Sequence, residues 1–163
     1  MRSCLTGCDG SCCTQRKSVR AGLIELGLQM YRSEGHFSRA ICNMLFDKIM
    51  YRRIESGETS VGIPDLWLRF PEREVWVELK NCNRLSINDK RWEIPWRKGQ
   101  QSFAVEYMKA TGQHTYTAVA MNDGYVVIPM HKRYTKNIVF ADDTYRMTRL
   151  KDIYIILESE VRK

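Results

Sequence analysis

Two segments of the chain carry acidic and basic side chains at strand spacing. Residues 65–70 and 75–80 each alternate apolar with polar side chains, and a short proline-containing stretch separates them, which predicts a β-hairpin. Residues two apart in a strand share a face, so Glu78 and Lys80 lie together, opposite the apolar side chains of their strand. Asp65 lies on the corresponding face of the preceding segment. If the two faces coincide, Asp65 and Glu78 meet across the hairpin with Lys80 beside them.

Such a cluster has a definite chemistry. Two converging carboxylates repel each other unless a cation lies between them, and hard oxygen ligands favour Mg²⁺ or Mn²⁺. A metal held there polarises a phosphoryl oxygen and lowers the pKa of a bound water, while a neighbouring lysine orients that water or stabilises charge on the phosphate. The pattern therefore predicts phosphodiester hydrolysis. Spacing alone equally allows a solvated ion pair between Glu78 and Lys80 on an exposed sheet face.

Residues 62–65 (Gly-Ile-Pro-Asp) and 78–80 (Glu-Leu-Lys) together resemble the motif of the PD-(D/E)xK nucleases. The resemblance is strongest to archaeal-type Holliday-junction resolvases, VRR-NUC-type nucleases and small phage-encoded relatives. Residues 53–56 (Arg-Ile-Glu-Ser) are similar to a stretch that many phage members carry. Residues 97–103, which read Arg-x-x-Gln-x-x-Phe and are followed by Gly112, are similar to the family's R-x-x-Q-x-x-aromatic helix.

The resemblance spans about residues 37–130 and implies both a fold and an activity. The fold is α/β, a restriction-endonuclease-like core with a mixed central β-sheet flanked by helices. The activity is endonucleolytic cleavage of DNA, including branched or structured DNA, with Mg²⁺ or Mn²⁺ as cofactor; resolvase-like relatives imply a homodimer. The implied catalytic residues are Asp65, Glu78, Lys80 and Gln100, and the implied metal-binding residues are Asp65, Glu78, Leu79 and Glu55.

Two of these residues have a second interpretation. Gln100 begins a helical stripe with Phe103 and Ala104, so its amide is expected to point toward the sheet and to find a partner there. The alternative is a surface amide at the start of the helix. Glu55 either joins the metal cluster, as a third acidic residue does in resolvase relatives, or is a surface carboxylate at the end of a helix.

A polar loop over residues 81–95 combines basic residues with tryptophans. This composition suits neutralisation of a nucleic-acid backbone together with contacts to bases or sugars, and the net charge of +7 favours a polyanionic partner. The alternative is that the tryptophans only fold the loop onto the domain. The candidate nucleic-acid-binding residues in and beside the loop are Arg84, Lys90, Arg91, Trp92, Arg97 and Lys98.

The elements that position these residues follow from periodicity and turn chemistry. A single nuclease-like domain is expected over 17–163, after a flexible cysteine-rich arm over 1–16, because 163 residues suit one domain. Besides the hairpin, the predicted elements are helices over 17–31, 37–52 and 97–111, strands over 115–121 and 125–130, and a last strand over 153–157.

Other function classes fit the composition less well. No apolar run approaches the ~20 residues of a membrane span, and the first residues lack the apolar segment of a secretory signal. We therefore expect a cytoplasmic protein, in the host cytoplasm if it is phage-encoded, with reduced thiols. The four cysteines between Cys4 and Cys13 have poor zinc spacing. The functional alternatives are a catalytically inert nucleic-acid-binding module on the same fold and a structural protein with an ion-pair network.

Overall fold

A six-stranded mixed β-sheet forms the centre of the computed structural model, which describes residues 31–54 and 62–163. The helices are α2 (Glu34–Leu45), α3 (Gln100–Thr111) and α4 (Leu150–Val161), with 3₁₀ turns η1 (Thr135–Asn137) and η2 (Ala141–Asp143). The strands are β1 (Met50–Arg53), β2 (Leu66–Arg69), β3 (Glu74–Asn81), β4 (Arg91–Glu93), β5 (Thr115–Ala120), β6 (Tyr125–Met130), β7 (Ile138–Phe140) and β8 (Tyr145–Met147).

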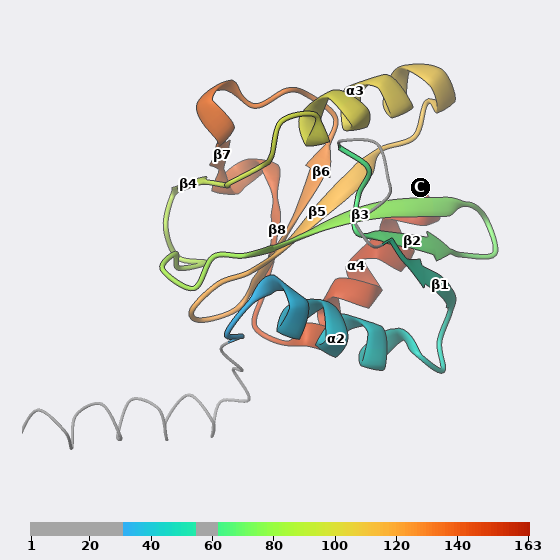
Figure 1. Cartoon of the computed structure of the whole chain (residues 1–163), viewed down its shortest axis with the longest axis horizontal. Helices are drawn as coiled ribbons and strands as arrows, with labels where there is room; N and C mark the ends of the chain where they lie inside the picture. The colour runs from blue at the N-terminus through green and yellow to red at the C-terminus, as the bar shows by residue number, and fades with distance from the viewer. Residues whose placement is uncertain (1–30, 55–61) are drawn as a thin grey trace, which may run out of the picture.

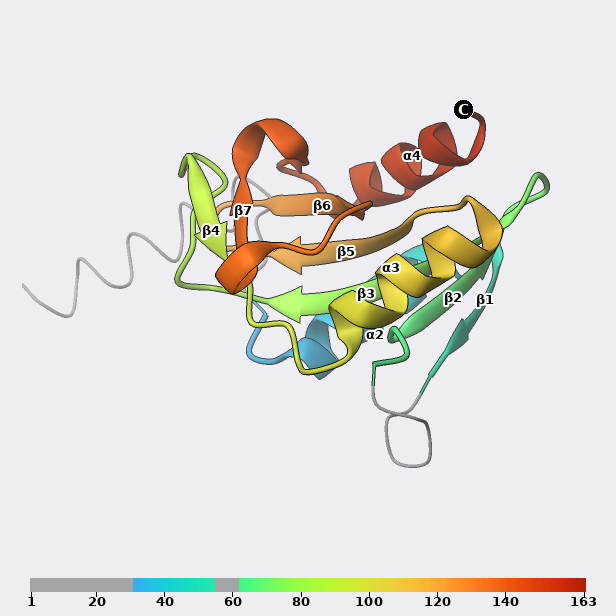
Figure 2. The same cartoon turned by 90° about the horizontal axis from the view of Figure 1, so that it is seen from above.

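The central sheet has the strand order β1-β2-β3-β5-β6-β8 (Figure 1). Neighbouring strands are antiparallel except β3 and β5, which are parallel. A parallel pair needs a crossover connection, and the segment that contains β4 and α3 supplies it (Figure 2). Helices cover both faces, α3 on one and α2 with α4 on the other. The sequence predicts this α/β arrangement, a mixed central sheet flanked by helices.

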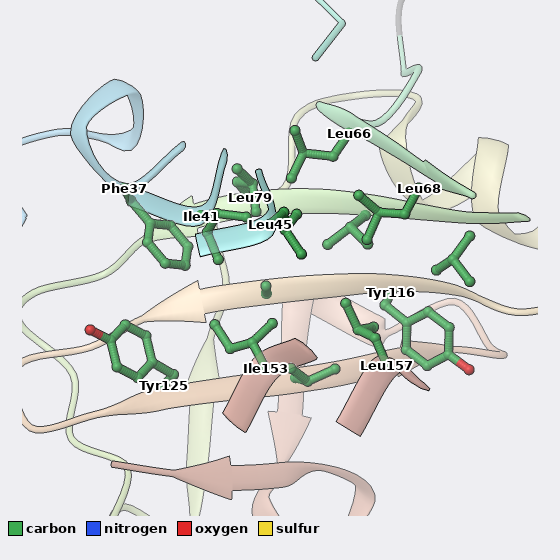
Figure 3. Packing of buried hydrophobic residues seen from close by; sticks show 14 of the residues in the cluster. Phe37, Ile41, Leu45, Leu66, Leu68, Leu79, Tyr116, Tyr125, Ile153 and Leu157 are labelled. Carbon is green, nitrogen blue, oxygen red and sulfur yellow. The ribbon is translucent and has the colours of Figure 1, made fainter. Parts of the chain in front are cut away.

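The two faces of the sheet bury separate apolar clusters. On one face Phe37, Ile41 and Leu45 of α2 and Ile153 and Leu157 of α4 pack against the apolar side chains of the strands (Figure 3). On the opposite face the second cluster joins α3 to β4 and β7, which form a separate antiparallel pair. Because β3 alternates, its valines and Leu79 point into the first cluster, and its polar positions point to the α3 side.

The helix predicted over 37–52 is wrong at both ends. It begins at Glu34, where Ser33 caps it by accepting a hydrogen bond from the His36 main-chain N–H at 3.3 Å, and it ends at Leu45. Residues 50–53 form β1 instead, paired antiparallel with β2. The hydrogen-bonding groups on the outer edge of β2 need partners, and this pairing overrides the weak helical pattern beyond Leu45.

The strand predicted over 153–157 is wrong as well. These residues lie in α4, where Ile153, Leu157 and Val161 recur every four residues and are buried, which is a helical period. The predicted loop over 81–95 contains β4, and β7 and β8 were not predicted; each of these strands has three residues, too few to show alternation. The helix expected over 17–31 and the arm over 1–16 fall outside the described residues, apart from Tyr31.

Candidate active site

The predicted meeting of the hairpin's two polar faces is confirmed by the strand register. Leu66 pairs with Val77 and Trp67 with Trp76, so the position before Leu66, Asp65, comes beside Glu78. The Asp65 carboxylate ends the row of main-chain hydrogen bonds between β2 and β3, because its Oδ2 accepts a hydrogen bond from the Leu79 main-chain N–H at 2.8 Å. Asp65 is thus held against β3 by a main-chain contact.

Glu78 and Lys80 form a buried ion pair. Glu78 is 5% exposed and Lys80 is 1% exposed, and Lys80 Nζ donates to Glu78 Oε1 at 2.6 Å. A solvated pair on an exposed sheet face is therefore excluded. The desolvation free energy of two buried charges usually exceeds their attraction unless further hydrogen bonds complete the site. The pair alone is therefore not expected to stabilise the fold.

Gln100 supplies one of those further hydrogen bonds. Its Nε2 donates to Glu78 Oε1 from the first turn of α3, as expected for an amide pointing toward the sheet. Its Oε1 accepts from the Arg97 main-chain N–H at 2.7 Å, so the amide also acts at the start of the helix. Both interpretations of Gln100 thus describe part of its contacts, and the side chain joins α3 to the ion pair.

The second oxygen of Glu78, Oε2, is buried and has no hydrogen-bond partner among the described residues. The pKa of Glu78 is raised to about 7, chiefly by burial; the Lys80 ammonium lowers it, and the charges of Asp65 and Glu34 contribute to the rise. A buried oxygen of this kind, beside a second carboxylate, fits a hard divalent cation. In residues 31–54 and 62–163 no three His, Cys, Asp or Glu side chains group into a metal site, so other oxygens would complete the coordination.

Glu34 is the acidic residue near this site that the sequence analysis missed. Its Oε1 lies 3.7 Å from Lys80 Nζ, and its Oε2 lies 3.9 Å from the Arg97 guanidinium. From the sequence alone, an acidic residue in the first turn of a helix indicates only a favourable interaction with the helix dipole. Glu55, the third acid that the resemblance implied, lies outside the described residues.

The start of α2 is fixed by two asparagines just beyond Lys80. Asn81 Nδ2 donates to the Tyr31 carbonyl oxygen at 2.9 Å, and Asn83 Nδ2 donates to the same oxygen. This main-chain anchor lies three residues before Glu34. The end of β3 therefore holds the segment that carries Glu34 toward Lys80.

Gly62 explains how Asp65 and α3 come close together. Its φ is +109°, and a Cβ at this position would lie 2.6 Å from the carbonyl oxygen of Gly99, closer than non-bonded atoms approach. Only glycine allows this backbone contact without strain. The contact joins the segment before Asp65 to the residue before Gln100.

The candidate nucleic-acid-binding residues divide into two groups. Arg84, Lys90, Arg91, Arg97 and Lys98 are exposed. The prediction for Trp92 needs correction, because this side chain is 1% exposed and its Nε1 donates to the Ser86 carbonyl oxygen at 2.6 Å; it has no free face for a base. Trp96 is also buried and donates to Thr117 Oγ1 at 3.0 Å. The tryptophans fold the loop onto the domain.

Comparisons with known proteins give a distant match. No family model matches the chain, and no curated protein matches its sequence. One similar solved structure is the 1.6 Å structure of Archaeoglobus fulgidus Hjc, a Holliday junction resolvase from an archaeal hyperthermophile. It has a TM-score of 0.47 and 13% sequence identity, and the match covers 77% of this chain and 97% of that one.

In the part of the chain that the structure describes, no helix is long and apolar enough to cross a membrane.

The raised pKa of Glu78 predicts a pH-dependent stability in the absence of divalent metal. Between about pH 4.5 and 7 the folded protein keeps the Glu78 proton that the unfolded chain has released, so the free energy of unfolding should fall as pH rises through this window. Urea unfolding at several pH values measures this trend. In Glu78→Gln the same contribution should be missing, and ¹³C NMR should show the loss of one carboxyl that titrates near 7. Identical pH dependence in the two proteins would contradict the shift.

Proposed function

We propose that this protein is a divalent-metal-dependent nuclease that hydrolyses phosphodiester bonds in DNA. The observation that carries the proposal is the state of Glu78: Lys80 and Gln100 donate to one oxygen, and the other is buried beside Asp65 with no partner in residues 31–54 and 62–163. A structural ion pair would not need a second carboxylate and an unsatisfied oxygen at the same place, because both raise the free energy of the folded state.

The residues of the cluster have separate proposed roles in metal binding, charge stabilisation and positioning. Asp65 and Glu78, with the main-chain oxygen of Leu79, would hold Mg²⁺ or Mn²⁺. A bound ion of this kind supplies Lewis-acid activation of water and phosphate. Lys80 lowers the pKa of Glu78 and so favours its ionised form, and it stabilises negative charge that develops on the phosphate. Gln100 fixes the orientation of the Glu78 carboxylate. Glu34, 3.7 Å from Lys80 Nζ, adds a further negative charge beside the site, and Glu55 stays a candidate third acid.

The remaining expectations belong to the same proposal. The substrate is branched or otherwise structured DNA, and Arg84, Lys90, Arg91, Arg97 and Lys98 contact its phosphates. The active form is a homodimer in the cytoplasm, and residues 17–163 form a single domain. The second candidate function is an inert nucleic-acid-binding module. Retention of both carboxylates and the lysine in one buried cluster favours the enzyme, since binding alone needs none of them.

Cleavage assays with a substrate panel test the proposal. Labelled linear duplex, flapped and four-way DNAs, with a matched RNA set, would be incubated with the full chain in the presence and absence of Mg²⁺ or Mn²⁺. We expect metal-dependent products from at least one DNA. An Asp65→Asn preparation, purified identically, controls for contaminating nucleases. Absence of cleavage with either metal would reject the enzyme, and binding without cleavage would favour the inert module.

A further inference from the structure

The segment after β6 runs back past the first turn of α3 (Figure 2), the same turn from which Gln100 donates to Glu78. Gln101 holds it there: its Oε1 accepts from the Tyr134 main-chain N–H at 2.7 Å, and its Nε2 donates to Asn137 Oδ1 at 2.6 Å. The ring of Tyr134 stacks on Trp96 with centroids 5.4 Å apart. Gln100 and Gln101 therefore connect the same helical turn to two places, the Glu78 carboxylate and this segment.

The segment presents positive charge to solvent. Arg133 and Lys136 are exposed, and among the described residues neither forms an ion pair with a carboxylate. Lys132, by contrast, pairs with Asp143 at 2.8 Å. Lys136 and Asn137 have φ values of +51° and +58°, a left-handed conformation that side-chain-bearing residues adopt at a cost. The contacts of Asn137 with Gln101 and Ile94 hold this turn in place.

The strand β7 continues this surface and adds an exposed aromatic side chain. Phe140 is 55% exposed, and it pairs directly across the two-stranded sheet with Arg91. Directly opposed residues share a face, so Arg91 and Phe140 lie side by side, while Trp92 and Val139 point into the core. Lys136 and Phe140 are four residues apart, and the turn at Lys136 and Asn137 shortens the path, so their Cα atoms lie within about 14 Å of each other.

We propose that Arg91, Arg133, Lys136 and Phe140 form a surface that binds nucleic acid with unpaired bases. This inference rests on the proposed nuclease function and names its substrate class. The basic side chains neutralise phosphates, and the ring of Phe140 stacks with a base that is not held in a duplex. Glu93 is exposed on the same outer face of the two-stranded sheet. Its charge opposes a polyanion, so it limits the affinity.

An acidic protein could pair with the basic side chains of this surface, but its carboxylates would give the ring of Phe140 no stacking partner. Phe140 is an exposed ring beside Arg91, and an exposed ring next to a guanidinium suits a base with its phosphate. The bases inside a duplex have both faces covered by their neighbours, whereas a flap, gap or junction offers an open base face to such a ring. The surface therefore selects DNA that carries an unpaired segment. Gln101, which holds the 133–137 part of the surface, follows directly on Gln100, which contacts Glu78.

Binding measurements in Ca²⁺ with three labelled DNAs test this surface: a flapped duplex, a single strand, and a blunt duplex long enough that internal sites far outnumber its two ends. Phe140→Ala should weaken binding of the flapped and single-stranded DNAs about 10-fold and leave the blunt duplex nearly unchanged. Arg133→Ala with Lys136→Ala should weaken all three and reduce the slope of log K against log salt by about 0.7 for each lost single-strand contact. Glu93→Gln should strengthen binding. The control is Lys151→Ala, an exposed residue on α4 across the sheet, which should change nothing.

The outcomes separate this inference from the proposed function. If the wild type binds and cleaves DNA but Phe140→Ala binds every substrate as tightly as the wild type, the surface is not the binding site for unpaired bases. If Phe140→Ala weakens the blunt duplex equally, base stacking is rejected. If the wild type binds none of the three DNAs and cleaves none of the panel, the nuclease proposal itself fails.

Discussion

Lys80→Met should slow cleavage about 100-fold or more and leave DNA binding largely unchanged. Lys80 is 1% exposed and donates to Glu78, so it contacts the substrate's phosphates only within the site. An electrostatic group that acts in the transition state appears in kcat rather than in binding, and about 100-fold is the scale for loss of one such group. Methionine keeps most of the stem, which preserves the packing.

Two measurements separate the direct role of Lys80 from its effect on Glu78. The ammonium lowers the pKa of Glu78, so the variant should hold that proton to higher pH and lose additional rate near neutral pH. Single-turnover cleavage from pH 7 to 9 would recover this additional loss but not the direct one. Binding is measured in Ca²⁺, which occupies such sites without supporting turnover.

The matched control for Lys80→Met is Lys151→Met on the opposite face of the sheet. It makes the same chemical change far from the cluster and should cleave at the wild-type rate. A wild-type rate in Lys80→Met itself would remove Lys80 from the chemistry. If its DNA affinity fell while its rate at saturating enzyme did not, Lys80 would be a phosphate contact, and the inert-module hypothesis would gain.

The hairpin was predictable from the sequence because its period and its turn agree. Alternation over residues 65–70 and 75–80 fixes which side chains share a face, and a short connection leaves little freedom in register. The register of Trp67 with Trp76 then follows, and so does the meeting of Asp65 and Glu78. The helix α3 was predictable for a similar reason: Gly112 ends it with φ +70°, and its N–H bonds to the Met108 carbonyl at 2.8 Å.

Glu34 and the surface around Phe140 were not predictable in this way. Glu34 meets Lys80 only because β1, β2 and β3 form a meander that brings α2 back to the end of β3, and no local pattern contains that contact. The short pair of β4 and β7 decides that Trp92 is buried and Phe140 exposed. The composition of residues 81–95 predicted a basic and aromatic surface, but the aromatic side chain that is exposed there, Phe140, comes from β7.

The same reasoning explains the error over 153–157. The residues Ile153, Ile155 and Ile156 are β-branched and favour a strand locally. Burial of Ile153 and Leu157 against the sheet requires a helical period instead, and Ile155 is left 52% exposed. Tertiary packing of one helical stripe therefore overrides the local preference of the side chains.

Asp65→Asn should weaken divalent-metal binding at least about 100-fold without unfolding the protein. The carboxylate has two functions that this change separates: it supplies negative charge next to Glu78, and its Oδ2 accepts the Leu79 N–H. An asparagine oxygen can still accept that hydrogen bond, but it does not carry the charge. Loss of an outer partner of a metal ligand already costs about 10–100-fold in affinity, so loss of a proposed ligand should cost at least as much.

Asp65→Ala distinguishes the two functions because it removes both. It leaves the Leu79 N–H without its partner, which costs about 1–3 kcal/mol of unfolding free energy. Calorimetry with Mn²⁺ and urea unfolding would therefore show a metal defect alone in Asp65→Asn, and a metal defect with lost stability in Asp65→Ala.

Asp89→Asn is the matched control for Asp65→Asn. Asp89 Oδ2 accepts the Ser86 main-chain N–H at 3.0 Å on the surface of the 81–95 loop, so the substitution makes the same chemical change to the same kind of contact outside the proposed site. It should bind metal like the wild type. If Asp65→Asn also binds Mn²⁺ with wild-type affinity, Asp65 is not a ligand. Its carboxylate would then serve only to end the strand ladder, and the buried oxygen of Glu78 would have to be explained without a metal ion.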